Sequence, residues 1–494
     1  MEAILQDVKT VRGYKLLLGY LGVFIALAGG IQLLALVGLL FNTEDMTYLP
    51  HFLIPGISSI VIGILLSFFI RGKHLAKLER FEDAVFLVLM WIIVIFISSI
   101  PFMMFGANFT QAVFETTAGY TTTGLSLFDA DTLPRIFVLY RSFLMLFGGV
   151  GLVLVLTSTI SDRYGLKLYN AEGHSENLIS NVAKSARLIL GIYIGYVVIG
   201  TILFMIFGMT LFDAINYSIT SVSTGGFAPH KESLGFYDSI GIEIIAMALM
   251  ILGSTNFLIH TFLITGQFKK AFKHAEWIVL VIAILIGVTF ITINLTATLN
   301  WEIGYSFRVA IFQFVSAITT TGLQNIPNLN ILPPLTIGII ILIMIMGGQA
   351  GSTTGAIKQS RVALAAKSSY WYLRDKMSGK RTLRSNFILR FGQYEKVNDV
   401  EIRHNYAFII LYMTFLLAGS YVFMAFGHSF ENSFFEFASL LGSVGYSSGI
   451  ISMQSPDLVL WTGTIGMFVG RLEITVIAIA IIKIYLNLTR KHIL

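Results

Sequence analysis

The sequence predicts an all-α polytopic membrane protein with four membrane–pore-loop–membrane repeats around one pore, preceded by two N-terminal transmembrane helices. Two observations predict this fold class. First, 55% of the 494 residues are hydrophobic and only 12% are charged, a composition typical of integral membrane proteins. Second, a short polar segment containing glycine occurs four times along the chain, each time between two apolar stretches. Such internal similarity indicates one structural unit that is used repeatedly.

The repeated segment is clearest in FETTAGYTTTGLS, residues 114–126. When Gly124 is the reference, three later glycines align with it: Gly225, Gly322 and Gly445. Two positions before each glycine lies a hydroxyl side chain: Thr122, Ser223, Thr320 or Ser443. Nine positions before it lies a polar side chain: Glu115, Asn216, Gln313 or Glu436. Glycine permits backbone angles that aim carbonyls inward, and a ring of carbonyl and hydroxyl oxygens can replace the water shell of a cation.

These four segments are therefore the predicted selectivity filter of a pore. Its residues are Thr122, Thr123, Gly124, Ser223, Thr224, Gly225, Thr320, Thr321, Gly322, Ser443, Val444 and Gly445. The hydroxyl residue and the glycine of each copy are the predicted cation ligands. The fourth copy, SVGY at residues 443–446, resembles the TVGY sequence of potassium-channel filters, which points to K⁺ as the ion, with no other cofactor. Glu115 and Glu436 are expected to hydrogen-bond backbone behind the filter.

The chain divides into an N-terminal hairpin and four repeats, and each part has two apolar spans near the ~20 residues that a helix needs to cross a bilayer. The predicted parts are residues 1–78 with spans 16–41 and 51–70, 79–172 with spans 83–105 and 133–160, 173–272 with spans 186–207 and 240–265, 273–400 with spans 276–295 and 335–365, and 401–494 with spans 406–426 and 458–486. In each repeat a short segment, such as 110–121, precedes the glycine. A helix of about 12 residues reaches only ~18 Å, so these helices are expected to enter the membrane and stop, with their partially negative carboxyl ends towards the pore.

Lysine and arginine are distributed unevenly between the two sides of the predicted membrane. Most of them, including those between residues 358 and 403, fall on the side of both termini, and the other side holds Arg135, Arg141, Lys231 and Arg308. The positive-inside rule then predicts a multi-pass protein of the cytoplasmic membrane with both termini in the cytoplasm. The absence of cysteine excludes disulfide and thiolate chemistry, and the first residues do not resemble a removable signal peptide.

A second polar stretch, GGQAGSTTGAIK at residues 347–358, interrupts the last span of repeat 3. Its glycines and hydroxyl residues, which disfavour a helix, are Gly347, Gly348, Gly351, Ser352, Thr353, Thr354 and Gly355. Non-helical backbone at membrane depth is tolerated where it lines a cavity, so this stretch is expected to line a cavity within the membrane. The alternatives are a kink that lets helices pack closely and a phosphate-binding loop, but the second lacks the GK[ST] order.

Arg471 interrupts an otherwise apolar span in repeat 4. A charge at this depth is costly and indicates a functional role for Arg471. The alternative is an arginine that pairs with a distant carboxylate, because Glu473, two positions on, would face away from it on a helix. Asn256 and His260, four positions apart, are expected to share a helix face, with His260 in a structural role.

The chain resembles the TrkH/KtrB superfamily of potassium-uptake proteins over about residues 80–487. The shared motifs are FGGVGLVL after the first filter segment, NFLIH in repeat 2, GGQAGSTTGAIK in repeat 3 and GRLE in repeat 4. The extra N-terminal hairpin is typical of TrkH-type members, whereas SVGYSSG in the last filter segment is closer to KtrB-type members. The resemblance implies K⁺ uptake through a selective pore, with residues 347–355 and Arg471 as an intramembrane gate below the filter.

The resemblance also implies partners. Members of the superfamily are homodimers in the lipid membrane, and they bind a cytosolic ring of nucleotide-binding subunits of the TrkA or KtrA type. In this chain the basic segment 367–405 would face that ring. No nucleic-acid partner is expected despite the formal net charge of +6, because the basic residues are confined to short stretches between spans.

Three other functions are alternatives to K⁺ uptake. A Na⁺-coupled or Na⁺-permeable cation transporter of the same fold is the nearest, although glycine in all four filter segments favours K⁺. A carrier with inverted repeats is disfavoured because the four units match in the same orientation. A membrane-bound enzyme would need clustered histidines or carboxylates in the spans, and the sequence has none there.

Overall fold

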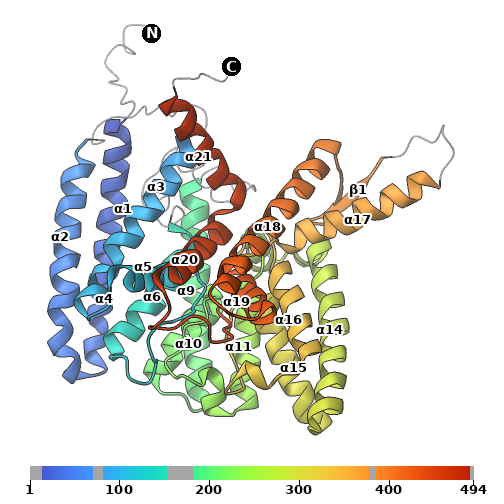
Figure 1. The fold of residues 1–494 in the computed structure, drawn as a ribbon, viewed down its shortest axis with the longest axis horizontal. Helices are drawn as coiled ribbons and strands as arrows, with labels where there is room; N and C mark the ends of the chain where they lie inside the picture. Colours follow the sequence, from blue (N-terminus) through green and yellow to red (C-terminus); the bar gives the residue numbers. More distant parts are fainter. Residues whose placement is uncertain (1–13, 70–81, 153–181, 378–384, 490–494) are drawn as a thin grey trace.

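The computed structural model describes residues 14–69, 82–152, 182–377 and 385–489. This part of the chain forms a helical bundle with one two-stranded hairpin, and the start of α1 (Tyr14–Leu34) lies at the same end as the last turns of α21 (Ile474–Leu488) (Figure 1). Within the described residues, six spans are long and apolar enough to cross a membrane, or up to eight if each sharply bent pair counts as one. The predicted all-α polytopic fold class is confirmed.

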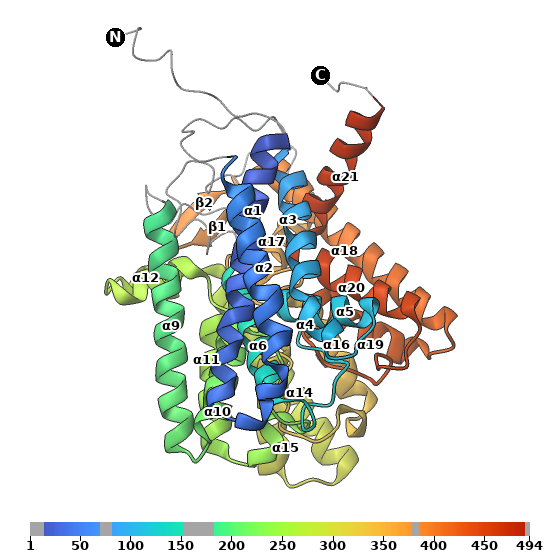
Figure 2. The same cartoon turned by 90° about the vertical axis from the view of Figure 1, so that its left-hand side faces the viewer.

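The N-terminal hairpin consists of α1 and α2 (Leu49–Ser67), joined by two 3₁₀ helices at Ala35–Leu40 and Thr43–Tyr48. Glycines bring the two helices close together. A Cβ atom on Gly22 would lie 2.6 Å from the carbonyl oxygen of Gly63, and a Cβ atom on Gly29 would lie 2.6 Å from that of Gly56. Small residues at such contacts let helix backbones approach in a membrane, where burial of apolar area gives little driving force. The hairpin flanks the rest of the bundle (Figure 2).

Each of the four predicted repeats contributes a first helix, a short buried helix and a second helix. The first helices are α3 (Glu82–Ser98) with α4 (Ile100–Met104), α9 (Val182–Ile206), α14 (Ala275–Leu299) and α18 (Asp399–Ala425). The short helices are α5 (Phe109–Tyr120), α10 (Leu211–Ser223), α15 (Ile303–Ile318) and α19 (Phe430–Gly442). The second helices are α6 (Arg135–Val150), α11 (Ile240–Gly253), α16 (Pro334–Met346) and α20 (Asp457–Leu472). All the second helices have 13 to 16 residues, so none crosses a bilayer alone.

Two of the predicted second spans are wrong as continuous helices. In the range 240–265, α11 is followed by α12 (Phe257–Ile264) at an angle of 106°, and in 458–486, α20 is followed by α21 at 103°. The predicted interruption of 335–365 is confirmed, because a loop joins α16 to α17 (Gln359–Lys376). In 133–160, α6 ends at Val150, and the part beyond residue 152 lies outside the described residues. Positive φ angles at Gly151 (98°) and Glu473 (63°) end α6 and α20, since right-handed helix cannot continue through that region.

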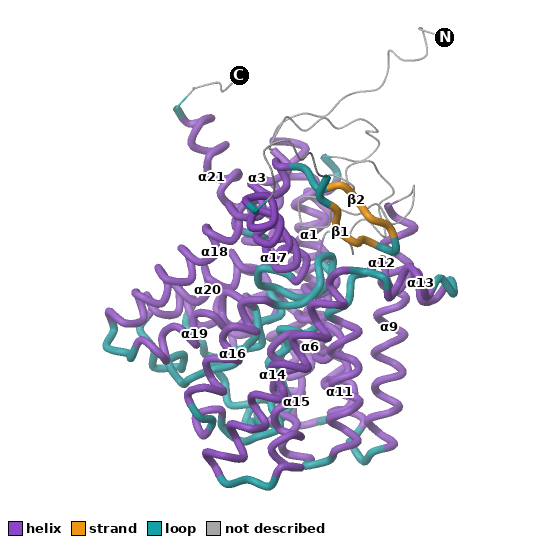
Figure 3. The backbone as a smooth tube through the Cα atoms, turned by 90° about the vertical axis from the view of Figure 1, so that its right-hand side faces the viewer, coloured by secondary structure: helices purple, strands orange, loops and turns teal. Residues whose placement is uncertain are grey.

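The described part of the basic segment between α17 and α18, residues 385–398, has more regular structure than the loop that the sequence predicted. It contains β1 (Phe387–Arg390) and β2 (Gln393–Lys396), paired antiparallel with Arg390 opposite Gln393. The two turn residues, Phe391 and Gly392, have φ angles of 43° and 82°, the conformation that matches the twist of a two-residue hairpin. The hairpin lies beside α12 and the short α13 (Phe268–Phe272) at one end of the bundle (Figure 3).

Candidate functional site

Four three-residue segments that follow the short helices share one backbone conformation. The first residue of each has a left-handed φ angle: 55° at Thr122, 52° at Thr224, 51° at Thr320 and 54° at Ser443. The third is a glycine with a positive φ angle: 69° at Gly124, 86° at Gly226, 78° at Gly322 and 93° at Gly445. Residues with a Cβ atom rarely adopt such angles, so their recurrence in four places marks one repeated structure.

The four segments close into a ring. A Cβ atom added to Gly226 would lie 2.5 Å from the carbonyl oxygen of Thr321. On the other three glycines it would overlap the carbonyl oxygen of the middle residue in the next segment, which pairs Gly124 with Gly225, Gly322 with Val444 and Gly445 with Thr123. The first segment thus meets the second, the second the third, the third the fourth, and the fourth the first. Only glycine fits at these contacts, and backbone carbonyls gather around one centre.

The second segment therefore comprises residues 224–226, one position later than the sequence alignment predicted. Gly225 is its middle residue, equivalent to Thr123, and Gly226 is equivalent to Gly124. Ser223 is still part of α10, where its hydroxyl donates to the carbonyl of Ile219 at 2.7 Å.

Contacts from the second helices give the same alignment. Cβ atoms on Gly148, Gly253 and Gly470 would overlap the carbonyl oxygens of three residues: Tyr120, Val222 and Leu441, respectively. Tyr120 and Leu441 each precede their ring glycine by four positions. Val222 has the same spacing only if the ring glycine of the second segment is Gly226. The adjacent pair Gly225–Gly226, preceded by Ser223–Thr224, fits the repeat in either register, which explains the error in the sequence prediction.

The hydroxyls at the first position of the segments have two kinds of environment. Those of Thr122 and Ser443 are buried without a hydrogen-bond partner in the described part of the chain. Those of Thr224 and Thr320 contact the loop between α16 and α17: Thr224 Oγ1 lies 2.9 Å from Thr353 Oγ1, and Thr320 Oγ1 accepts from the Gly355 N–H at 3.3 Å. This loop therefore lies directly against the ring.

Two buried carboxylates hold the backbone that follows the ring glycines. Glu115 Oε2 accepts from the Leu127 N–H at 2.9 Å, and Glu436 Oε2 accepts from the Ser448 N–H at 2.5 Å. The expectation that both glutamates bond backbone behind the ring is confirmed. Asn216 does not share this role, because its amide donates to the Phe212 carbonyl within α10.

The side chain next to Asn216, Tyr217, takes the glutamate position in the second repeat. Its hydroxyl donates at 2.8 Å to the carbonyl of Ser233, beyond the ring glycine. Tyr217 lies nine residues before Gly226. With the corrected alignment, the second repeat therefore also has a polar side chain at this position that bonds backbone behind the ring.

Arg141 is a buried functional residue that the sequence analysis missed. Its side chain is 1% exposed and forms an ion pair of 3.5 Å with Glu115, which is fully buried. It also donates to Ser126 Oγ at 3.0 Å and lies 4.8 Å from the ring centroid of Phe227, directly after the second segment. Arg141 thus ties the first two repeats together behind the ring. The sequence contained a signal for this role, because a charged residue within the apolar helix α6 is as unusual as the charged Arg471 in α20.

Replacing Arg141 with methionine is expected to destabilise the protein by about 3–5 kcal/mol, because it leaves the Glu115 carboxylate buried and unpaired. Thermal unfolding in detergent, followed by loss of the monodisperse size-exclusion peak, measures the effect. The double variant Arg141→Met/Glu115→Gln should recover most of the loss. A double variant no more stable than Arg141→Met would show that the pair does not set the stability.

Arg471 reaches the loop that lies against the ring. One terminal nitrogen donates to the carbonyl of Thr353, and the other donates to the carbonyls of Gly148 at 2.6 Å and Gly149 at 2.9 Å. The guanidinium therefore joins the end of α6, the end of α20 and the loop. Glu473 accepts instead from Arg361, with both oxygens at 2.9 Å.

Comparison with known proteins identifies the family to which this architecture belongs. The family model TrkH, described as a cation transport protein, matches residues 49–486. The chain belongs to this family. Relatives include the cation transporter MJ1485 of Methanocaldococcus jannaschii, which is 29% identical and aligns over 96% of each chain, and the Trk system potassium uptake protein TrkH of Halomonas elongata, which is 26% identical over 91% of this chain and 97% of the relative.

A solved structure supports the fold. The crystal structure of the potassium transporter TrkH from Vibrio parahaemolyticus superposes with a TM-score of 0.79 at 23% sequence identity, covering 93% of this chain and 98% of that one. The arrangement of helices described above is therefore that of the TrkH family.

In this TrkH-family protein, residues at the break between α11 and α12 form hydrogen bonds with the polar loop of repeat 3, and these bonds are called the clamp below. The Phe257 N–H donates to the Gly351 carbonyl at 2.9 Å, and the Asn256 amide donates to the Ala350 carbonyl at 2.7 Å. The Asn256 N–H in turn donates to Gln349 Oε1 at 3.0 Å. The loop is thus bonded residue by residue to the segment at which the membrane helix turns.

The prediction that Asn256 and His260 share a helix face is wrong. Asn256 precedes α12 and caps it, accepting from the Leu258 N–H at 2.8 Å. Capping side chains lie at the end of a helix, not along its face. His260 is buried, and its Nδ1 lies 2.9 Å from the hydroxyl of Tyr196, which fits the structural role expected for it.

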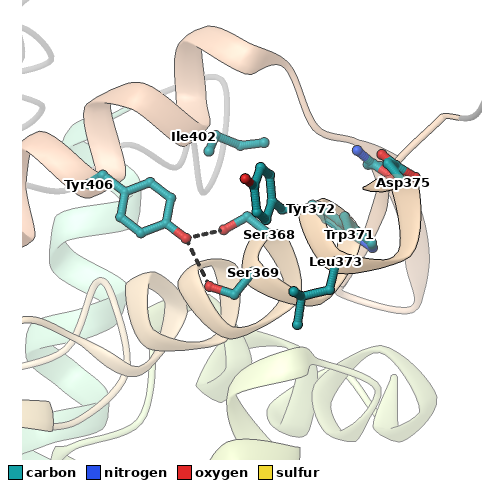
Figure 4. Close-up of a pocket in the computed structure, with 9 residues that line it drawn as sticks. Ser368, Ser369, Trp371, Tyr372, Leu373, Asp375, Ile402 and Tyr406 are labelled. Atoms are coloured by element: carbon teal, nitrogen blue, oxygen red, sulfur yellow. Dashed lines mark hydrogen bonds between the residues drawn. The ribbon is translucent and has the colours of Figure 1, made fainter. Parts of the chain in front are cut away.

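A groove opens between α17 and the first turns of α18, beside the residues that precede β1 (Figure 4). Its floor carries hydroxyls: Tyr406 lies 2.9 Å from Ser368 and 3.1 Å from Ser369. Its walls include the aromatic rings of Trp371 and Tyr372. The groove lies in the basic segment that the sequence analysis assigned to contacts with a cytosolic partner.

Proposed function

We propose that this TrkH-family protein takes up K⁺ across the cytoplasmic membrane through a selective, gated pore, as the membrane subunit of a Trk-type system. The observation that carries the proposal is the ring in which each of four glycines packs on a carbonyl of the next segment. Relatives named as Trk system potassium uptake proteins favour K⁺ over Na⁺ as the ion.

In this proposal the ring is the selectivity filter, with segments 122–124, 224–226, 320–322 and 443–445. K⁺ exchanges its water shell for backbone carbonyls and for the hydroxyls at the first positions, two of which are free to face an ion. The carboxyl ends of the four short helices add partial negative charge that favours a cation beside the ring. The buried contacts of Glu115, Glu436 and Tyr217 fix the backbone behind it, so that the oxygens stay at the spacing that an ion requires.

The gate consists of the loop at residues 347–355 together with Arg471. The loop lies against the filter through Thr353 and Gly355, and Arg471 holds it by the Thr353 carbonyl. A polar loop at membrane depth must line a water-filled path or have buried hydrogen-bond partners. The partners of this loop are Asn256 and the residues of the ring. Movement of the loop away from the ring would open the path.

The orientation and the partners follow the charge distribution and the family. The basic segment that includes the hairpin β1–β2 faces the cytoplasm, as do both termini. The groove beside Tyr406 and the exposed residues around it offer a docking surface for a cytosolic nucleotide-binding ring of the TrkA type. Two copies of the chain form the homodimer on that ring.

Flux measurements test the choice of ion. Purified protein in liposomes should take up K⁺ and its tracer rubidium at least about tenfold faster than Na⁺, a ratio equal to about 1.4 kcal/mol of discrimination. The same protein should restore growth of cells that lack K⁺ uptake in medium without sodium. Equal rates for the two ions, or growth that requires sodium, would overturn K⁺ uptake in favour of a Na⁺-linked transporter.

A further inference from the structure

The chain between α11 and α14 forms an arm that leaves the side of the bundle (Figure 3). The arm comprises residues 257–273 and contains α12 and α13. Because α12 turns by 106° from α11, it runs across the bundle axis rather than along it. Three large apolar side chains of the arm are more than half exposed: Ile264 at 62%, Phe268 at 58% and Phe272 at 58%.

Lysines accompany these apolar side chains. Lys269, Lys270 and Lys273 are exposed, and the arm contains no acidic residue. Exposed aromatic residues beside lysines are typical of segments that lie in a membrane interface, with rings at the acyl boundary and cations at the headgroups. The negative surface of the cytosolic leaflet attracts such clusters by about 1 kcal/mol per lysine, or roughly fivefold.

The neighbouring helix sets the depth of the arm. Directly after it begins α14, an apolar helix of 25 residues that can cross the membrane. Trp277, in the first turn of α14, donates its indole N–H to the Ala271 carbonyl at 3.0 Å, and tryptophan is enriched at the interface. The hairpin covers the other side of the arm, where the Gly392 N–H donates to the Lys273 carbonyl at 2.7 Å. The arm therefore lies where a span enters the bilayer.

The inner end of the arm is the clamp on the gate loop. Asn256 and Phe257, at the start of α12, bond the carbonyls of Ala350 and Gly351. Since α12 is one short rigid helix, a force that fixes its outer end also fixes the loop that its inner end holds.

We propose that the arm binds anionic phospholipid of the cytosolic leaflet through Lys269, Lys270 and Lys273, and that the bound lipid holds the gate loop against the filter. The binding rests on the arm and on the proposed cytosolic orientation, and its consequence for flux rests also on the proposed pore. A bilayer is the occupant that matches the surface, because it offers apolar chains to the phenylalanines and anionic headgroups to the lysines at the depth where α14 begins.

A fluorescent label on the arm measures lipid binding independently of transport. The chain has no cysteine, so Gln267→Cys gives a single labelling site on the exposed arm. The labelled protein is placed in nanodiscs that contain brominated phosphatidylglycerol or brominated phosphatidylcholine. Stronger quenching by the anionic lipid is expected, with the preference reduced at least about fivefold in Lys269→Gln/Lys270→Gln/Lys273→Gln. The matched triple arginine variant, which keeps the charges, should retain it.

Flux in liposomes then tests the coupling to the gate. In vesicles with one quarter phosphatidylglycerol, the triple glutamine variant should pass K⁺ at least twofold faster than the wild type, while the arginine variant behaves like the wild type. In vesicles of phosphatidylcholine alone this difference should disappear. An equal quenching preference in the glutamine variant would overturn the lipid site and leave the lysines to a protein partner. A lost preference with unchanged flux would overturn the coupling, and an absence of K⁺ flux in every variant would count against the pore, not the lipid site.

Discussion

Replacing Gly226 with alanine is expected to reduce K⁺ flux by at least about tenfold and to weaken selection of K⁺ over Na⁺. The φ angle of 86° at Gly226 costs a residue with a Cβ atom roughly 1–2 kcal/mol. The added methyl group would also lie 2.5 Å from the carbonyl oxygen of Thr321. That oxygen is part of the backbone of the next segment, so it can move only by distorting the ring. Uptake of K⁺ and Na⁺ by purified variants in liposomes measures both effects.

The neighbouring variant Gly225→Ala is the matched control, because it adds the same methyl group one residue earlier. The other three segments carry threonine or valine at this position, so the backbone tolerates a side chain there. The new methyl group would meet the side chain of Met145, and the double variant Gly225→Ala/Met145→Ala should restore flux close to the wild type. If Gly225→Ala abolished selectivity with or without Met145→Ala, while Gly226→Ala kept it, the corrected alignment of the ring would be wrong.

The sequence carries the parts of the fold that depend on composition and local repetition. Apolar length reveals the first helices of the repeats. Recurring glycines reveal the short helices and the segments after them, because a Cβ atom at a position such as Gly124 would overlap a carbonyl oxygen of the next segment. The carboxylates behind the ring were also predictable. Glu115 and Glu436 hold a fixed offset from the ring glycine, and a buried carboxylate needs donors nearby.

The sequence could not give the features that depend on contacts between repeats. Gly225 and Gly226 satisfy the repeat pattern equally well, and only the backbone angles and the contacts of Gly226 and Gly253 with neighbouring carbonyls distinguish them. Similarly, the break after Gly253 contains no proline, and its polar residues Ser254, Thr255 and Asn256 do not by themselves predict the direction of the turn. The break is stabilised by bonds from Asn256 to a loop more than ninety residues later, and a local pattern of residues cannot reveal these bonds.

Arg141 illustrates a different limit. The positive-inside count treated it as one of the few basic residues on the outer side. In the structure it is 1% exposed and paired with Glu115. A count of charges by segment cannot separate a buried, paired arginine from a solvated one, whereas the cost of an unpaired charge in the bundle could have suggested the partner.

Replacing Arg471 with alanine is expected to increase K⁺ flux by the isolated protein. Its guanidinium lies beside the gate loop and donates to the carbonyls of Thr353, Gly148 and Gly149. A positive charge ~6 Å from a passing K⁺ repels it by roughly 3 kcal/mol at an effective dielectric constant of ~20. At 1.36 kcal/mol per factor of ten, that barrier slows passage by up to about two orders of magnitude, and water in the path reduces the effect.

Arg471→Lys separates the charge of this residue from its hydrogen bonds. Lysine keeps the positive charge but loses the planar arrangement that bonds three carbonyls at once, so its flux should fall between those of the wild type and Arg471→Ala. If Arg471 only stabilised the helix ends, both variants would be poorly folded and neither would conduct faster. Flux is therefore measured per folded protein, after size-exclusion chromatography in detergent. Well-folded Arg471→Ala with unchanged or lower K⁺ flux would contradict the electrostatic barrier assigned to Arg471.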